Sequence, residues 1–146
     1  MTLEFVPATE NDRGFYRHVH HLAYRPDIEK MFGWDEALQD KFADKDFDTR
    51  NPTLVYFNKN KVGVIGWLER ENDIWFGPVF ILPEFQGQGI GTLILKHFMT
   101  EAEHRKIPLS LQTLAVNERA KKWYETLGFH TIEKSAIHWQ MQYKPK

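Results

Sequence analysis

The chain reads Val79-Phe80-Ile81-Leu82-Pro83-Glu84-Phe85-Gln86-Gly87-Gln88-Gly89-Ile90-Gly91, an apolar run that leads into three glycines at alternate positions. Because glycine has no side chain, the backbone can turn sharply there and approach a ligand closely. A helical pattern of apolar residues begins at Ile90, and the unpaired N–H groups and dipole of a helix start favour an anion. The stretch therefore predicts a strand, a phosphate-binding loop and a helix in succession.

Two common phosphate-binding loops do not fit this stretch. The spacing is not G-x-x-x-x-G-K-[ST], which argues against a nucleoside-triphosphatase loop. It is not G-x-G-x-x-G either, and the region about 20 residues past Gly91, Leu109–Thr113, has no acidic residue to hold a ribose. A glycine-rich turn that only joins a strand to a helix is the remaining alternative, because short glycine motifs are weak signals.

Working outward from the loop, the spacing of apolar residues predicts elements in the order β-α-α-β-β-β-α-β-α-β. The expected elements are a strand at Leu3–Phe5, a helix capped by Thr9 and ended or bent by Pro26, a helix over Asp35–Phe42, strands at Thr53–Phe57, Val62–Leu68 and Ile74–Leu82, a helix from Ile90 to Ala102, a strand at Leu109–Val116, a helix from Asn117 to Leu127, and a strand at Ile137–Tyr143. This order indicates the α/β (α+β) class, with a mixed, mostly antiparallel central sheet flanked by helices.

Several of these elements carry more detailed expectations. On the second helix, Leu38 and Phe42 share one face. In the third strand, Gly77-Pro78 predicts a bulge or splay, because proline cannot donate a hydrogen bond to the sheet. The long helix should bury a stripe made of Ile90, Leu93, Ile94, Phe98 and Ala102.

Length and composition exclude several classes of protein. The 146 residues suit a single domain, residues 1–146, and a hydrophobic fraction of 42% is enough for a packed core. The absence of cysteine excludes a disulfide scaffold, a thiolate zinc site and a cysteine nucleophile. A net charge of −1 without a dense basic patch argues against nucleic-acid binding. No apolar run suits a membrane span, and the N-terminus does not read as a signal peptide, so a cytoplasmic protein is expected.

Two sequence blocks in order resemble the GCN5-related N-acetyltransferase (GNAT) superfamily. The first is a strand followed by Q/R-x-x-G-x-G/A, which maps on Gln86, Gly89 and Gly91. The second comprises Val116-Asn117, Ala120, Trp123-Tyr124 and Leu127-Gly128-Phe129. Together the blocks span residues 74–130, and the resemblance implies the same mixed sheet that the element order predicts.

The resemblance implies acetyl-CoA as the co-substrate, and no metal is expected from the residues themselves. Its pyrophosphate would lie on the loop amides of Gln88–Thr92, and its pantetheine arm would pair like a strand near Phe80–Leu82. The implied cofactor-binding residues are Phe80, Ile81, Leu82, Gln86, Gly87, Gln88, Gly89, Ile90, Gly91, Thr92, Asn117, Arg119 and Tyr124. For Arg119, an ordinary solvated helix face is the alternative.

Acetyl transfer from a thioester to an amine needs a neutral amine, a donor for the oxyanion and a proton for the leaving thiolate. Tyr124 matches the tyrosine that often serves as the acid in this family; the alternative is a purely packing role. The strand before the loop has no acidic residue, so the base stays open among His20, His21, Asp35, Glu69 and His138. His21 and Glu69 complete the predicted catalytic set. A metal site at His18, His20 and His21 is disfavoured, because no cysteine or carboxylate motif accompanies them.

The acceptor side is predicted from an acidic segment between the first helix and the sheet. Its acids are Asp35, Glu36, Asp40, Asp44, Asp46 and Asp48. They would attract a cationic amine, or simply form a solvated helix face. The predicted substrate-binding residues are Tyr24, Trp34, Asp35 and His138.

The sequence thus favours an acetyl-CoA-dependent N-acetyltransferase that moves an acetyl group to a primary amine by direct attack in a ternary complex. The partner would be a small-molecule or peptide amine, with no nucleic acid and no membrane. A non-catalytic acyl-CoA-binding sensor is the alternative. The identity of the acceptor, the use of other acyl groups, and the choice between a monomer and a homodimer stay open.

Overall fold

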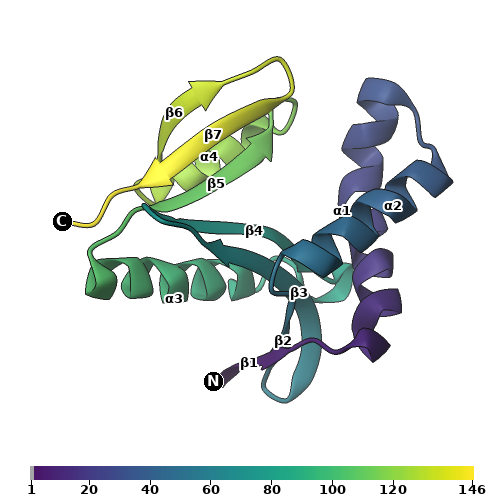
Figure 1. Ribbon diagram of the computed structural model, residues 1–146, viewed down its shortest axis with the longest axis horizontal. Helices are drawn as coiled ribbons and strands as arrows, with labels where there is room; N and C mark the ends of the chain where they lie inside the picture. The colour runs from purple at the N-terminus through teal and green to yellow at the C-terminus, as the bar shows by residue number, and fades with distance from the viewer. Residues whose placement is uncertain (1) are drawn as a thin grey trace. The chain divides into compact units, whose positions relative to one another are not determined.

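The computed structural model describes residues 2–146 and leaves Met1, the first residue of the predicted domain, outside (Figure 1). Within these residues lie seven strands and four α-helices: β1 (Leu3–Pro7), α1 (Arg13–Phe32), α2 (Glu36–Thr49), β2 (Thr53–Phe57), β3 (Asn60–Glu69), β4 (Ile74–Ile81), α3 (Ile90–Arg105), β5 (Leu109–Leu114), α4 (Glu118–Thr126), β6 (His130–Lys134) and β7 (His138–Tyr143). Single turns of 3-10 helix precede α1 at Glu10–Asp12 and α3 at Pro83–Phe85.

The strands follow the order β1-β2-β3-β4-β5-β7-β6. β4 and β5 run parallel, whereas β1–β2, β2–β3, β5–β7 and β6–β7 run antiparallel. The predicted mixed, mostly antiparallel sheet is therefore confirmed. No helix among residues 2–146 is both long and apolar enough to cross a membrane.

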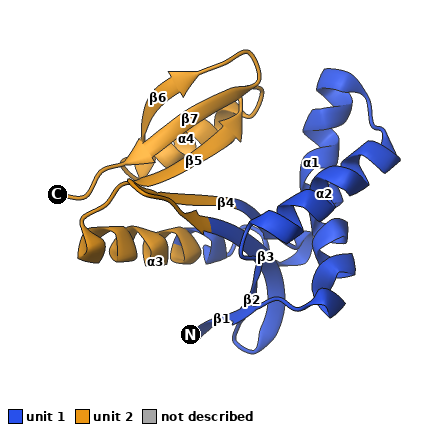
Figure 2. Ribbon diagram, viewed as in Figure 1, with its two compact units in different colours: residues 1–67, 78–92 blue, residues 68–77, 93–146 orange. Residues whose placement is uncertain are grey.

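Two compact units divide the chain (Figure 2). Unit 1 comprises residues 1–67 and 78–92, and unit 2 comprises residues 68–77 and 93–146. The chain crosses between the units inside β3, inside β4 and inside α3. Each unit is described by itself below.

Unit 1 packs α1 and α2 on the strands β2, β3 and the end of β4. Its core comprises Tyr16, Val19, Ala43, Phe47, Leu54, Val64 and Phe80. Thr9 caps the 3-10 turn that leads into α1 rather than α1 itself. The Thr9 N–H donates to the Asp12 carboxylate at 2.8 Å, and α1 begins at Arg13. Pro26 does not end the helix, which continues to Phe32.

The second helix begins where predicted but is longer and buries a different face. The Asp35 side chain caps α2 by accepting from the Leu38 N–H at 3.1 Å. The helix runs to Thr49 rather than Phe42 and buries Gln39, Ala43 and Phe47. Leu38 and Phe42 share one face of α2 as predicted, but they are 43% and 48% exposed, so this face is not the one that the helix buries. The acids of residues 40–48 obscured the continuing helical period in the sequence.

The strands predicted at Thr53–Phe57 and Val62–Leu68 are β2 and β3, and they form an antiparallel hairpin with Asn58 and Lys59 at φ values of 50° and 69° in the turn. The strand predicted over Ile74–Leu82 is β4, which runs unbroken through Gly77 at φ 119°. Its parallel register with β5 covers Ile74–Leu109 and Trp75–Ser110 and includes neither Phe76 nor Gly77. This early end of the register agrees with the splay expected at Gly77-Pro78.

In unit 2 the predicted α4 is confirmed. The Asn117 side chain caps the helix by accepting from the Ala120 N–H at 3.1 Å, and Gly128 follows its end at φ 101°. In α3, Leu93 is 38% exposed and Leu95 is fully buried, so the predicted stripe was wrong at Leu93.

Strand β6 is absent from the predicted order. All five of its residues are exposed, and it lies at the edge of the sheet beside β7. Because none of its residues enters the core, the segment has no need for the alternation of apolar and polar residues that marks a half-buried strand, and Ile132 is its one apolar residue. Pairing with β7, rather than a local pattern, makes it a strand.

Candidate active site

The glycine loop lies in unit 1 between the 3-10 turn and α3. The Gln86 side-chain amide donates to the Ile81 carbonyl at 2.9 Å and ties the loop to the end of β4. Gly87 and Gly89 have φ values of 77° and 82°, and a side-chain atom built on either would meet nothing within 4 Å. The loop is therefore a bend with open space on its glycine side, and α3 begins directly after it at the buried Ile90.

This loop fits the pyrophosphate of CoA. The first N–H groups of a helix have no partner within the helix, and the helix dipole adds partial positive charge there. The open space at the glycines is the place that a bound phosphate would fill.

The end of β4 offers one backbone edge for a pantetheine arm. The Leu82 N–H donates to the Val62 carbonyl on β3 at 2.8 Å. Since successive residues of a strand direct their backbone groups to opposite sides, the N–H and C=O of Ile81 point away from β3. The Ile81 carbonyl already accepts from Gln86, which leaves its N–H as the donor on that edge. Of the predicted residues Phe80–Leu82, Ile81 is thus the one suited to pair with an extended ligand.

Aromatic residues of α1 pack against Phe80, on the face of β4 that α1 covers. Phe80 is 2% exposed, and its ring lies edge-on to those of Tyr16, His20 and Tyr24, with centroids 5.7, 5.8 and 5.4 Å away. Burial raises the pKa of the Tyr16 hydroxyl well above its usual range. The predicted substrate residue Tyr24 therefore belongs to a wall that packs on β4.

Two neighbouring histidines and an aspartate form a hydrogen-bonded chain beside this wall. The Nδ1 atoms of His20 and His21 are 2.9 Å apart, and His21 Nε2 is 2.7 Å from Asp40 Oδ1 on α2. His20 is 2% exposed, whereas the His21 side chain is 15% exposed. Burial, with the neighbouring charge of His21, lowers the pKa of His20 to about 4.

The other predicted acceptor residues of unit 1 surround His21. The Trp34 ring lies edge-on to the His21 ring at 5.1 Å, and its indole N–H donates to Glu36 at 2.5 Å. His21, Glu36 and Asp40 offer ligand atoms within 4.8 Å of one another, a set that could hold a metal ion. Asp35 instead caps α2, which gives it a structural role.

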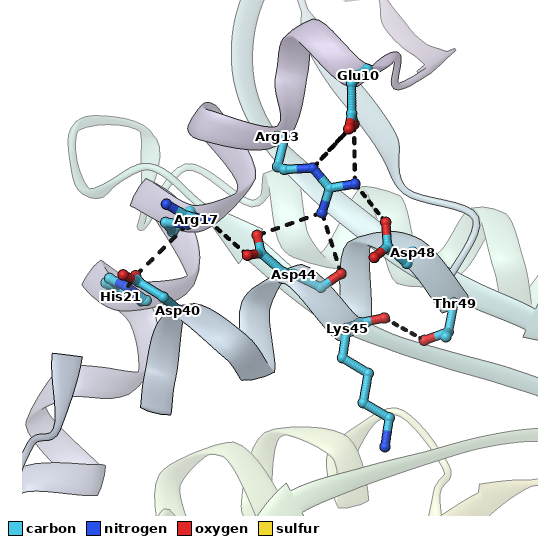
Figure 3. Close-up of polar contacts among 9 residues, drawn as sticks. All are labelled: Glu10, Arg13, Arg17, His21, Asp40, Asp44, Lys45, Asp48 and Thr49. Carbon is cyan, nitrogen blue, oxygen red and sulfur yellow. Dashed lines mark hydrogen bonds and ion pairs between the residues drawn. The ribbon is translucent and has the colours of Figure 1, made fainter. Parts of the chain in front are cut away.

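Three carboxylates of the acidic segment, Asp40, Asp44 and Asp48, pair with arginines of α1 (Figure 3). Arg13 pairs with Asp48 at 2.5 Å and with Asp44 at 3.5 Å, and Arg17 pairs with Asp44 at 2.7 Å. Half of the predicted acidic rim is therefore part of an interhelical network, and sequence analysis missed Arg13 and Arg17 as its partners. Glu36, with a side chain that is 62% exposed, keeps its charge toward solvent.

Unit 2 holds the remaining predicted residues. Burial raises the pKa of Tyr124 to about 12, so its hydroxyl carries a proton at neutral pH. The Tyr124 ring packs against those of Trp123 and Phe129, with centroids 4.9 and 5.8 Å away. Glu69 forms an ion pair with Arg105, and partial burial lowers the pKa of His138.

Comparison with known proteins agrees with this geometry. A family model described as the acetyltransferase (GNAT) domain matches residues 50–131, more than half of the chain. The chain belongs to the GNAT acetyltransferase family. No curated protein matches it.

Solved structures share the fold of this GNAT chain. They include an N-acetyltransferase, PaiA, from Thermoplasma acidophilum in complex with coenzyme A, with 13% identity, 99% of each chain covered and a TM-score of 0.76. The ribosomal-protein-S18-alanine N-acetyltransferase from Escherichia coli has 19% identity over 98% of this chain and 94% of that one, with a TM-score of 0.66. A spermidine N-acetyltransferase chimera from Vibrio cholerae and hSSAT has 17% identity over 99% and 96%, with a TM-score of 0.66.

Proposed function

We propose that this GNAT protein transfers the acetyl group of acetyl-CoA to a primary amine by direct attack in a ternary complex. The observation that carries the proposal is the open glycine loop at the start of α3, where Gly87 and Gly89 leave room for a phosphate. Bound acetyl-CoA would supply the activated acetyl group. Gln86–Thr92 would hold its pyrophosphate, and the Ile81 N–H would pair with its pantetheine arm. Asn117 and Arg119 would contribute from unit 2, Asn117 by holding the start of α4.

Tyr124 is the proposed acid for the leaving thiolate. Its raised pKa keeps the proton on the hydroxyl over the whole physiological range. The assignment itself rests on the family motif Trp123-Tyr124 followed by Leu127-Gly128. Glu69 is a weaker candidate for the base than His21, because Arg105 already pairs with its carboxylate.

A primary amine is the proposed acceptor class. The relatives are described as acetylating an alanine of a ribosomal protein and spermidine, and both descriptions name amines. Tyr24 and Trp34 would form the apolar part of the acceptor site, and Glu36 would attract a cationic group. His138 is proposed for the same role on unit 2.

A thiol-release assay tests the proposal directly. The protein contains no cysteine, so every thiol that appears comes from CoA. We expect release that depends on an amine from a panel of polyamines, amino acids and peptides with an N-terminal alanine, with the acetylated amine seen by mass spectrometry. Acetyl-CoA binding without product on any amine would instead identify the acyl-CoA-binding sensor.

The loop can be tested by a matched pair of variants. Gly89→Asp places a carboxylate in the proposed pyrophosphate site, and at about 5 Å with an effective dielectric constant of about 20 the repulsion is about 3 kcal/mol per phosphate charge. We therefore expect at least a hundredfold loss of CoA affinity by calorimetry. Gly33→Asp is the control, because Gly33 also has a positive φ, 80°, and open space around it. Equal affinities in the two variants would contradict the proposed loop.

We also propose that residues 1–146 form one acetyltransferase domain. β3, β4 and α3 each run from one compact unit into the other without a linker. A single cooperative unfolding transition, seen alike by fluorescence and circular dichroism, is expected. Two separate transitions would show that the units fold independently.

A further inference from the structure

We propose that His20, His21 and Asp40 form a proton relay that takes the proton of the acceptor amine, with His20 as the group that meets the amine. The inference rests on the proposed function and names the base that it requires. The three side chains come from α1 and α2 and lie in one hydrogen-bonded line.

The hydrogen bonds determine where the protons lie. An ionised carboxylate can only accept, so His21 Nε2 must carry the proton that it shares with Asp40 at 2.7 Å. When both rings are neutral, His21 Nδ1 then has a lone pair, and the contact of 2.9 Å requires the proton on His20 Nδ1. His20 Nε2 is left with a lone pair and can act as a base.

The proton transfer balances along this line. An ammonium group gives its proton to His20 Nε2, and the His20 Nδ1 proton passes to His21 Nδ1. His21 then carries protons on both nitrogens, and its positive charge lies beside the Asp40 carboxylate. His20 ends as the neutral Nε2–H form, and the amine becomes a neutral nucleophile.

Burial explains why two histidines are needed. His20 is 2% exposed, so a positive charge retained on it would be poorly solvated. His21 lies closer to solvent, with Asp40 at 2.7 Å and Glu36 at 3.6 Å from its Nε2. Transfer of the positive charge to His21 therefore lets the buried His20 ring act as a base and moves the charge toward solvent.

The placement of His20 suits the acceptor side of the reaction. Its ring lies edge-on to Phe80, which precedes Ile81 on the strand proposed to bind the pantetheine arm. The titratable and charged groups that face the relay are Tyr24 and Arg17 from α1 and Glu36 and Asp40 from α2. Arg17 Nε is 3.7 Å from Asp40 Oδ1, so its positive charge lies beside that carboxylate as well.

The tautomers can be observed without any activity. Long-range ¹H–¹⁵N spectra of the histidine-labelled protein at pH 7.5 should show His20 protonated at Nδ1 and neutral His21 protonated at Nε2. A His20 ring protonated at Nε2, or a His21 ring that is already an imidazolium at this pH, would overturn the relay.

Kinetics provide the second test. His21→Asn removes the group that receives the charge, and since general base catalysis contributes about 10²–10⁴-fold, kcat should fall at least about tenfold with unchanged KM for acetyl-CoA. Asp40→Asn removes the charge that stabilises the His21 imidazolium, so the acid limb of kcat/KM for the amine should move about one pH unit lower. His21 and Asp40 are only half-buried, so these two variants test the relay without changing the fully buried His20.

Two controls separate a relay from a structural role. His18→Asn changes an exposed histidine of the same helix, and Asp48→Asn removes an acid of the same α1–α2 network that pairs with Arg13. Both should keep the wild-type pH profile. Wild-type kinetics in His21→Asn, or an unmoved acid limb in Asp40→Asn, would overturn the relay while the acetyltransferase stands. A wild-type protein without product on any amine would overturn the proposed function itself.

Discussion

Gly63 on β3 is the position where a single methyl group should do the most damage. A side-chain atom built there would collide with the carbonyl oxygen of Phe80 and would lie 3.0 Å from its carbonyl carbon and 3.1 Å from Ile81 Cα. These are main-chain atoms of β4, which cannot rotate away. Ordinary contacts of this kind lie at 3.4–4 Å, so β3 and β4 would have to separate locally by about an ångström or more.

Such overpacking costs about 1–3 kcal/mol, and more where the backbone must move. For Gly63→Ala we expect a loss of about 3 kcal/mol in the free energy of unfolding, which for a chain of this size lowers Tm by about 6–12 °C. Because the displaced strand is the one proposed to pair with pantetheine, acetyl-CoA affinity should fall as well.

The assay is urea unfolding monitored by tryptophan fluorescence, together with a thermal scan. Gly14→Ala is the matched control, because a side-chain atom at Gly14 on α1 meets nothing within 4 Å. It should leave stability unchanged or raise it slightly. A Gly63→Ala protein with wild-type stability would refute the close approach of β3 and β4 on which the argument depends.

Three further predictions concern single side chains. Tyr124→Phe keeps the packed ring but removes the proposed proton donor, so kcat should fall at least about tenfold while Tm and CoA affinity hold. An unchanged kcat would remove Tyr124 from the mechanism. Hydrogen bonds from Arg70 and Ser110 lower the pKa of the buried Asp73. The ionised carboxylate therefore stabilises the fold at pH values above its unfolded pKa of about 3.9, and this stabilisation is lost as the pH falls through the lower pKa of the folded state. Asp73→Asn should cost about 1–3 kcal/mol at pH 7 and flatten the acid limb in urea titrations from pH 3 to 7, and an unchanged pH dependence would contradict this. The hydroxyl of Tyr16 is buried and has no hydrogen-bond partner among residues 2–146. Tyr16→Phe should therefore leave the free energy of unfolding unchanged or raise it by up to about 1 kcal/mol, and a decrease of more than about 1 kcal/mol would reveal a partner.

Most elements of the fold could be predicted because their signals are local. The glycine loop, the Asn117 cap of α4 and the turn at Asn58-Lys59 depend on a few neighbouring residues, and the structure has all three. The buried face of α2 could not be predicted, because it is chosen by what packs against the helix. Ala43 and Phe47 belong to the core that α1 and the sheet form, whereas Leu38 and Phe42 are largely exposed, although their spacing is equally helical.

The candidate site likewise has features that the sequence predicts and features that only the structure reveals. The sequence by itself determined the loop, its family motif and the residue types available for acid–base chemistry, because these follow from composition and short spacings. It also placed His20 and His21 side by side, but not Asp40, which lies 19 positions further along the chain. Only the tertiary structure brought α2 against α1, so that Arg13 and Arg17 paired with three of the acids expected to attract an amine and Asp40 met His21. The partner of a charged side chain depends on the packing and register of two helices, and those are decided by the whole core rather than by any local pattern.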